Sequence, residues 1–476
     1  MKKIILLPIF FVFSILGAQS SFIKIETIQV EGNKRTKEFI VLRELNLAVG
    51  DTITLGNVEA RLNRNRNQLL NTGLFTEVEL KIEDWDKKTG RAKLHILLQE
   101  NVPIYPYAWA SLLDVDFNVW KNVHNSDLSR TQPYLGFKHI NLTGRQDKLS
   151  LYLQAGFTNQ EQLLRSTFLR KVQAIYTSPY LNKAQTLRAN GNIFVSNERS
   201  IRVNTFNNRD SFLRSDNSQL LIRVRLESGI DYRPGLYEQH EFRIGYFDRS
   251  FNAALLDLDD NYFFGGQNRQ QFLSLSYRFI SDRRDFQLYA KSGYFLDIGL
   301  TKEGLGIWGD RNALIFDAEF SKYWSFNSKL SLEVTARGRT NLQRETIDYY
   351  NLPVVGPKPE VVRGYITQHI RGSDFAFLKS SFRYQVLNLS INLGKYMPIK
   401  AYRNIPMQVY LKLNNDLAYI RTAIGSDASN TLINRRLYGR GVGIDIVTAN
   451  LSLLELMYNF NDLGERQFDF HFYYAF

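Results

Sequence analysis

The chain has 476 residues and no cysteine, which excludes disulfide bonds, thiol catalysis and thiolate metal ligands. It carries 60 lysine and arginine residues against 47 aspartate and glutamate residues, a formal net charge of +13, and it is rich in Tyr and Phe. No nucleic-acid-binding motif accompanies the basic excess, so we expect these charges to face a polar lumen or anionic lipid headgroups and to bind no nucleic acid.

Residues 1–18 have the layout of a secretory signal peptide. Met1-Lys2-Lys3 is basic, an apolar run follows, and Leu16-Gly17-Ala18 ends in small residues that predict cleavage after Ala18. The run is too short for a membrane-spanning helix, and no later stretch of about 18 apolar residues occurs. We therefore expect an exported chain that spans a membrane, if at all, with strands.

Residues 22–102 show helical and strand periods together and predict a small mixed domain in the order β-α-α-β-β. The expected elements are a strand over 23–30, a helix over 36–45 with Thr36 as N-cap, a helix over 55–72 ended by Gly73, and strands over 78–82 and 94–98.

This ordered set resembles a POTRA domain, a small periplasmic module that binds other chains, often through an exposed strand edge. The residues that carry the resemblance are Val30-Glu31-Gly32-Asn33, Thr36, Gly50-Asp51, Gly73-Leu74-Phe75 and Val78. A generic α/β domain is the alternative interpretation of the same pattern.

From about residue 103 to residue 476 the helical period disappears, and apolar residues alternate with polar ones, as at Leu149-Leu151-Leu153 and Val409-Leu411-Leu413. Polar stretches rich in Gly and Asn separate these segments. The pattern is typical of an antiparallel transmembrane β-barrel, whose strands present apolar side chains to lipid and polar ones to the lumen. The fold class we predict is mostly β.

The C-terminus ends in a strict period of two. Its aromatic row is Phe468, Phe470, Phe472, Tyr474 and Phe476, and the chain stops at Phe476. Such a row resembles the assembly signal of outer-membrane barrels, in which the last strand shows lipid an apolar face and leaves an edge for pairing. A half-buried last strand of a soluble sandwich is the alternative.

A short motif, Val362-Arg363-Gly364-Tyr365, follows a segment stiffened by three prolines between residues 353 and 359. It matches the (V/I)RG(F/Y) motif of the BamA/TamA outer-membrane superfamily. The resemblance implies a barrel of 16 strands and a long loop whose motif folds back into the barrel. An arginine in that place needs carboxylate partners.

The resemblance implies Asp416 as the partner of Arg363, because Leu413 to Tyr419 looks like the family's aspartate-bearing strand. The chain departs from the pattern at three positions. Ala418 replaces a glycine, Asn414 replaces an aromatic residue, and Ser381 stands where the family often has a glutamate. We therefore expect one carboxylate, and not two, to hold Arg363.

Catalytic patterns are missing from the sequence. The six histidines form no HExxH or paired metal spacing, and there is no GxSxG, P-loop or dinucleotide fingerprint. We expect no enzymatic activity, no catalytic residue, no metal and no cofactor.

The resemblance implies a protein of the outer membrane of a Gram-negative bacterium, with residues 22–102 in the periplasm and residues 103–476 in the membrane. Its expected work is insertion or translocation of outer-membrane or secreted client proteins, through the POTRA edge and a seam between the first strand, near Ile104 to Leu112, and the last. Outer-membrane lipid and periplasmic or lipoprotein subunits are the other expected partners. The alternatives are an accessory or scaffold subunit, a passive channel and, in a different class, a barrel enzyme.

Overall fold

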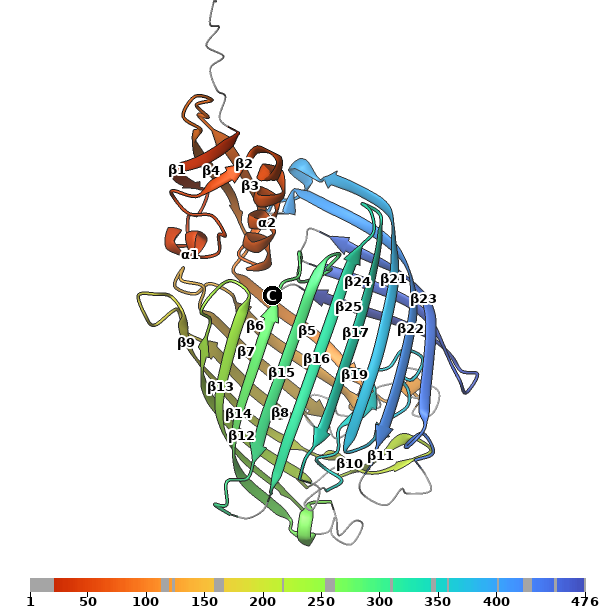
Figure 1. The fold of residues 1–476 in the computed structure, drawn as a ribbon. Helices are drawn as coiled ribbons and strands as arrows, with labels where there is room; N and C mark the ends of the chain where they lie inside the picture. Colours follow the sequence, from red (N-terminus) through yellow and green to blue (C-terminus); the bar gives the residue numbers. More distant parts are fainter. Residues whose placement is uncertain are drawn as a thin grey trace, which may run out of the picture.

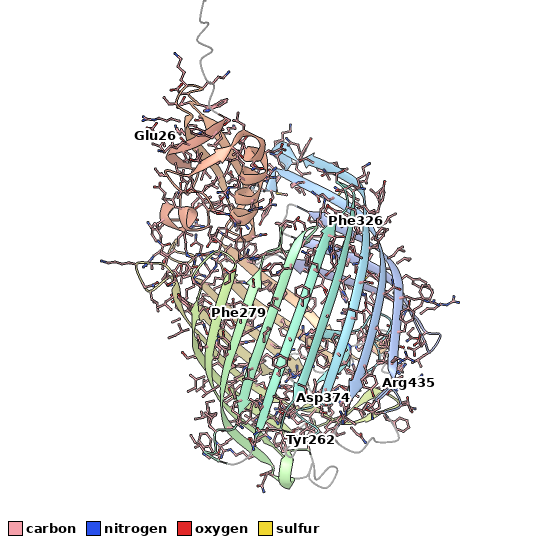
Figure 2. The ribbon with its side chains drawn as sticks, viewed as in Figure 1. Glu26, Tyr262, Phe279, Phe326, Asp374 and Arg435 are labelled. Atoms are coloured by element: carbon pink, nitrogen blue, oxygen red, sulfur yellow. The ribbon has the colours of Figure 1, made fainter. Side chains whose placement is uncertain are left out.

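The computed structural model describes residues 21–476, except for residues 113–119, 122–124, 158–166, 216–217, 253–261, 309–310, 344–347, 358, 400–401, 423–429, 449–451 and 475–476. The predicted signal peptide lies outside the described residues. A small N-terminal domain sits against one end of a large barrel (Figure 1). We call that end of the barrel the near end and the opposite one the far end; Phe326 lies at the near end, and Asp374 and Arg435 lie toward the far end (Figure 2).

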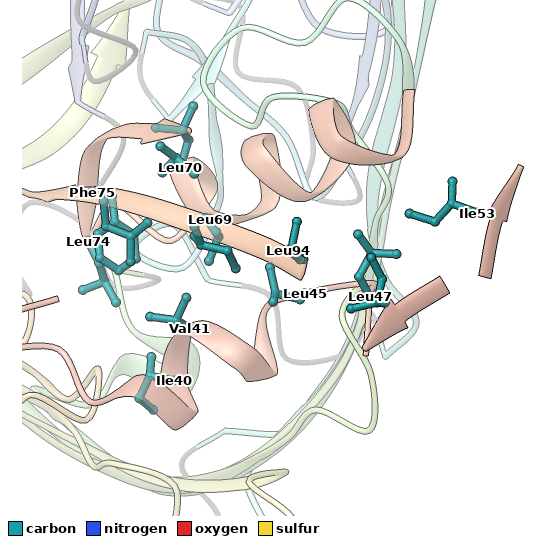
Figure 3. Close-up of a cluster of buried hydrophobic side chains, with 14 of the residues drawn as sticks. Ile40, Val41, Leu45, Leu47, Ile53, Leu69, Leu70, Leu74, Phe75 and Leu94 are labelled. Carbon is teal, nitrogen blue, oxygen red and sulfur yellow. The ribbon is translucent and has the colours of Figure 1, made fainter. Parts of the chain in front are cut away.

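The N-terminal domain is a four-stranded sheet with two helices. Its elements are β1 (Phe22–Glu31), α1 (Glu38–Arg43), β2 (Thr52–Thr54), α2 (Val58–Asn71), β3 (Phe75–Glu83) and β4 (Arg91–Glu100). The strand order is β2-β1-β4-β3, with β1 parallel to β4. The alternating residues of β4 and one side of each helix bury a common apolar core, which includes Leu69, Leu94 and Val41 (Figure 3).

The domain differs from the sequence prediction in two places. Thr36 is not the N-cap of the first helix: Lys37 precedes α1, and no side chain caps it. Thr36 is instead buried, and its hydroxyl accepts a hydrogen bond of 3.0 Å from Asn141 Nδ2 of the barrel. The strand β2 was not expected, because three residues are too few to show a period.

The barrel is one antiparallel sheet of 16 strands, which confirms the predicted number and the predicted fold class. The strands are β5 (Ile104–Leu112), β6 (Thr131–His139), β7 (Lys148–Phe157), β8 (Thr167–Thr177), β9 (Leu187–Glu198), β12 (Leu221–Tyr232), β13 (Glu238–Phe251), β14 (Arg269–Asp282), β15 (Gly293–Glu303), β16 (Ala313–Ser325), β17 (Leu330–Asn341), β21 (Asp374–Asn392), β22 (Asn404–Arg421), β23 (Arg436–Thr448), β24 (Ser452–Asn461) and β25 (Arg466–Tyr474). Each strand pairs with the next in this order, and β5 and β25 are the two edges of the sheet.

Strand β22 shows how the sequence sorts residues between the two faces of the barrel. Leu411 and Leu413 are 49% and 55% exposed on the outer face, whereas Lys412 and Asp416 are buried on the lumen side. This apolar-out, polar-in alternation is what a barrel in lipid requires. No helix of the described residues is long and apolar enough to cross a membrane.

Two smaller sheets are separate from the 16-stranded sheet. One is the hairpin of β10 (Ser200–Phe206) and β11 (Arg209–Arg214), and the other consists of β18 (Val354–Gly356), β19 (Glu360–Val361) and β20 (Ile370–Arg371). The second sheet belongs to the long loop between β17 and β21, which carries the sequence motif at residues 362–365.

Candidate functional site

The loop motif lies inside the barrel, against the lumen face of β21 and β22. Val362 and Tyr365 are fully buried, and Arg363 is 9% exposed. Val362 and Tyr365 pack in one apolar cluster with Phe375 and Phe377 of β21. This packing holds the intervening arginine toward the barrel wall.

Arg363 meets Asp416 on β22. Its Nε donates to Asp416 Oδ1 at 2.8 Å, its Nη2 donates to the same oxygen, and its backbone N–H donates to Asp416 Oδ2 at 2.9 Å. Asp416 is 1% exposed. Both carboxylate oxygens are therefore used by one residue, the arrangement that makes a buried guanidinium tolerable.

Two of the positions that depart from the family pattern also hold this arginine. Arg363 Nη1 donates to Ser381 Oγ at 2.8 Å and to Asn414 Oδ1, and Ser381 Oγ donates to Asn414 Oδ1 at 2.9 Å. Among the described residues, Asp416 is the one carboxylate that Arg363 contacts, and its other hydrogen-bond partners are neutral oxygens. The third position, Ala418, packs its methyl group in the apolar cluster with Tyr365.

The motif also contacts the far-end turn between β24 and β25. Gly364 has φ +87°, and a Cβ there would lie 2.7 Å from the carbonyl oxygen of Phe460, so glycine is required. Asn461 Nδ2 donates to the Gly364 carbonyl at 2.6 Å, and Gln467 Oε1 accepts from the Ile366 N–H at 3.2 Å. The loop thus ties the wall at β22 to the last strand of the sheet.

Gly439 on β23 gives a direct test of this docking. A Cβ on Gly439 would lie 1.8 Å from the carbonyl oxygen of Arg363. We expect Gly439→Ala to displace the loop and to destabilise it by about 1–3 kcal/mol, the usual result of overpacking. Limited proteolysis of the loop should detect the change, and Gly299→Ala, whose Cβ would meet nothing nearer than 3.9 Å, is the control. Equal cleavage of both variants would contradict the prediction.

A second arginine in the same loop was not found by sequence reasoning. Arg371 is 2% exposed, and its Nη2 donates to both carboxylate oxygens of Asp210 on the β10–β11 hairpin, at 2.7 and 2.8 Å. His369 Nδ1 accepts from the Asp210 N–H at 3.2 Å. The long loop is therefore fixed at one end to the wall and at the other to this hairpin.

The first and last strands carry strongly exposed aromatic side chains. Trp109 on β5 is 69% exposed, and Phe468 and Phe470 on β25 are 67% and 69% exposed. Phe472 is also exposed, whereas the side chain of Tyr474 and all of Phe476 lie outside the described residues. Among the described residues, no strand ladder joins β5 to β25. The predicted seam residues thus lie along the two edges of the sheet.

The N-terminal domain is fixed to the near-end turns of the barrel by a buried ion pair. Glu44, which follows α1 and is 3% exposed, accepts from both Nη atoms of Arg233 at 2.7 and 2.9 Å. Burial, the largest single influence, would raise the pKa of the Glu44 carboxyl, but the charge and hydrogen bonds of Arg233 together with the charges of Arg43 and Arg188 outweigh it and lower the pKa below its ordinary value. Glu44 therefore stays ionised.

The near-end turn between β14 and β15, residues 283–292, folds into the barrel. Tyr289 is 6% exposed, lies tilted against Tyr410 with 4.6 Å between ring centroids, and donates to Asp445 Oδ2 on β23 at 2.9 Å. The Gln287 N–H donates to Asn71 Oδ1 of α2 at 3.0 Å. This turn therefore connects the N-terminal domain with β23, five strands from β15 in the sheet.

No group of three or more His, Asp or Glu side chains among the described residues is suited to hold a metal ion.

The 16-stranded barrel, its inward-folded loop and the small β-rich domain before it define an outer-membrane β-barrel of the class that carries POTRA domains. A POTRA family model (surface antigen variable number repeat) matches residues 23–101, and an Omp85 superfamily domain model matches residues 141–472. The chain belongs to the Omp85 superfamily, a superfamily of protein insertion and transport at the outer membrane.

Two solved structures are similar to this chain at low sequence identity. CdiB from Escherichia coli is 12% identical with a TM-score of 0.53, over 95% of this chain and 75% of that one. BamA from Haemophilus ducreyi lacking POTRA domains 1–3 is 14% identical with a TM-score of 0.48, over 94% and 84% of the two chains. No curated protein sequence matches the chain.

Proposed function

We propose that this protein inserts or translocates client proteins at the outer membrane through a lateral seam between β5 and β25, and that it does so without enzymatic activity. Its POTRA domain faces the periplasm and receives the client. Membership of the Omp85 superfamily supports the general role. The observation that carries the mechanism is the sheet with two edge strands, lined by exposed aromatic residues.

An edge strand presents unpaired N–H and C=O groups, to which a client strand can add. Burial and backbone pairing of the client supply the driving force, so no nucleotide is needed. Outer-membrane lipid contacts the outer face, and periplasmic or lipoprotein subunits dock at the POTRA domain. The Arg363 loop keeps β22 in register with the β24–β25 turn while the other edge opens.

A disulfide across the seam tests this proposal. Because the chain has no cysteine, one Cys in residues 107–110 and one in residues 468–471 give a single possible bond. We expect oxidation of this pair to abolish client folding in proteoliposomes and reduction to restore it, because the client loses access to both edges. The yield of folded client, separated by its heat-modifiable gel mobility, is the measurement.

The matched control is the pair Leu456→Cys and Phe470→Cys, which lie opposite each other in the ladder of β24 and β25. A bond there links strands that are already paired and should leave client folding unchanged. If the seam bond forms fully and client folding continues, the seam is not used, and an accessory or scaffold role replaces the proposal. Solute flux through the locked protein would identify a passive channel.

A further inference from the structure

Strands β21 and β22 continue past the near end of the barrel as a two-stranded hairpin. β21 pairs with β17 only as far as Tyr384, yet it runs on to Asn392, and β22 pairs with β23 only from Met407. We call residues 386–408 the β21–β22 extension; at about 3.3 Å per residue its strands reach roughly 26 Å beyond the pairing with β17. The extension curves over the near end toward α2 (Figure 1), and Tyr402 OH donates to Asn101 Oδ1 at 3.1 Å.

The two faces of the extension differ in chemistry. One face continues the outer, apolar row of the barrel, and its paired residues are Leu387 with Val409, Leu389 with Met407, and Ile391 with Ile405. The other face continues the lumen row, and its paired residues are Asn388 with Gln408, Ser390 with Pro406, and Asn392 with Asn404. Leu387 and Leu389 are 47% and 38% exposed, so the apolar row is open.

The hydrogen-bonding phase of the extension follows from its last pair. The Leu393 N–H donates to the Arg403 carbonyl at 2.8 Å, which makes this a hydrogen-bonded pair. Such pairs alternate in an antiparallel ladder, so Asn388, Ser390 and Asn392 turn their N–H and C=O groups away from β22. These groups form a free edge, since none of the described residues pairs with residues 386–392 on that side.

The β22 edge of this hairpin is protected against pairing with a further strand, whereas the β21 edge is not. Pro406 faces Ser390, so it lies at an outward-facing position of β22, where a proline prevents strand addition. Residues 386–392 contain no proline and no charged side chain. A long, apolar and unprotected edge is a hazard that natural proteins avoid unless something pairs with it.

The surroundings of this edge indicate its partner. Among its described residues the extension carries Lys395 and Arg403 and no acidic residue, so it suits a segment with negative charge. It also contacts the end of the POTRA domain through Asn101, on the route between that domain and the barrel. We propose that residues 386–392 of β21 bind an extended segment of a client polypeptide by strand addition, with apolar and polar or acidic side chains in alternation. This inference rests on the proposed function.

A peptide-binding measurement tests the docking strand without requiring insertion. The probe is a fluorescent peptide with the sequence of residues 466–476, which alternates aromatic with polar residues, carries Asp469 and ends in a free carboxylate. Ser390→Pro removes one outward N–H of the edge and leaves the ladder with β22 intact, and Ser390→Ala keeps that N–H. We expect Kd, measured by anisotropy with protein in lipid nanodiscs, to rise about tenfold for the proline variant and less than about twofold for the alanine variant.

A photocrosslinker in place of Leu389 then identifies what covers the apolar face. Crosslinks to the peptide, absent with a scrambled peptide of the same composition, support the proposal. Crosslinks to lipid alone, or an unchanged Kd in a Ser390→Pro protein that keeps its heat-modifiable mobility, overturn it. The two proposals can fail separately. If peptide binding depends on the Ser390 N–H while the protein with the seam disulfide still folds client, residues 386–392 bind the peptide and only the seam proposal is wrong.

Discussion

Replacing Asp416 with alanine is expected to destabilise the barrel more than any other single change at the loop site. The substitution leaves the guanidinium of Arg363 buried with only neutral partners, Ser381 and Asn414. Removing one partner of a buried ion pair costs about 3–5 kcal/mol. The temperature at which the folded gel band of the purified protein disappears should therefore fall for Asp416→Ala.

The control is the double variant Arg363→Ala and Asp416→Ala, which removes both charges. The double variant should lose less stability than the sum of the losses in the two single variants, because it contains no unpaired buried charge. Asn415→Ala, on the exposed side of the same strand, should change little. If the losses simply add, the two residues are not coupled in the folded protein.

The second large effect concerns the contact between the POTRA domain and the barrel. Arg233→Ala removes the bidentate partner of the buried Glu44 carboxylate and leaves it, among the described residues, the single hydrogen bond from Arg43 Nη1, at a cost of up to about 3 kcal/mol. We expect the POTRA domain to detach from the near-end turns while both parts stay folded. Spin labels on introduced cysteines, one in each part, should show a single narrow distance in the wild type and a broad distribution in the variant.

This contact should also depend on pH. The pKa of Glu44 is lowered in the folded protein, so the stabilisation is complete above the ordinary glutamate pKa of about 4.3 and is lost as the pH falls through the lowered value. The distance distribution should stay narrow at pH 7 and broaden only in strong acid. In the Glu44→Gln variant the distance distribution should not depend on pH. Broadening of the wild-type distribution near neutral pH would contradict the role of Glu44 in this contact.

The sequence was informative wherever a local period or motif exists. The alternation of residues such as Leu411 and Leu413 was enough to predict a barrel, because a strand between lipid and lumen must alternate. The motif at residues 362–365 drew attention to Arg363 and Asp416, which the structure places within hydrogen-bonding distance. The three departures from the family pattern did not by themselves indicate that Ser381 and Asn414 bind the arginine.

Contacts between residues far apart in the chain could not be predicted from the sequence. Glu44 and Arg233 are 189 residues apart, and Arg371 and Asp210 are 161 residues apart, so no spacing relates them. The β10–β11 hairpin was likewise not foreseen, because its polar residues look like those of a loop. The extension of β21 and β22 was hidden for another reason: its alternation continues that of the membrane strands without a break.

The β14–β15 turn has a mechanical consequence. Its Gln287 is hydrogen-bonded to the POTRA domain, its Tyr289 to Asp445 on β23, and its Ala290 carbonyl to Arg383 on β21. A pull on the POTRA domain is thus transmitted across the lumen to the C-terminal strands as a load on three hydrogen bonds. The turn therefore couples the two parts mechanically. A client that pulls the POTRA domain away from the membrane would place strain on the strands next to the seam.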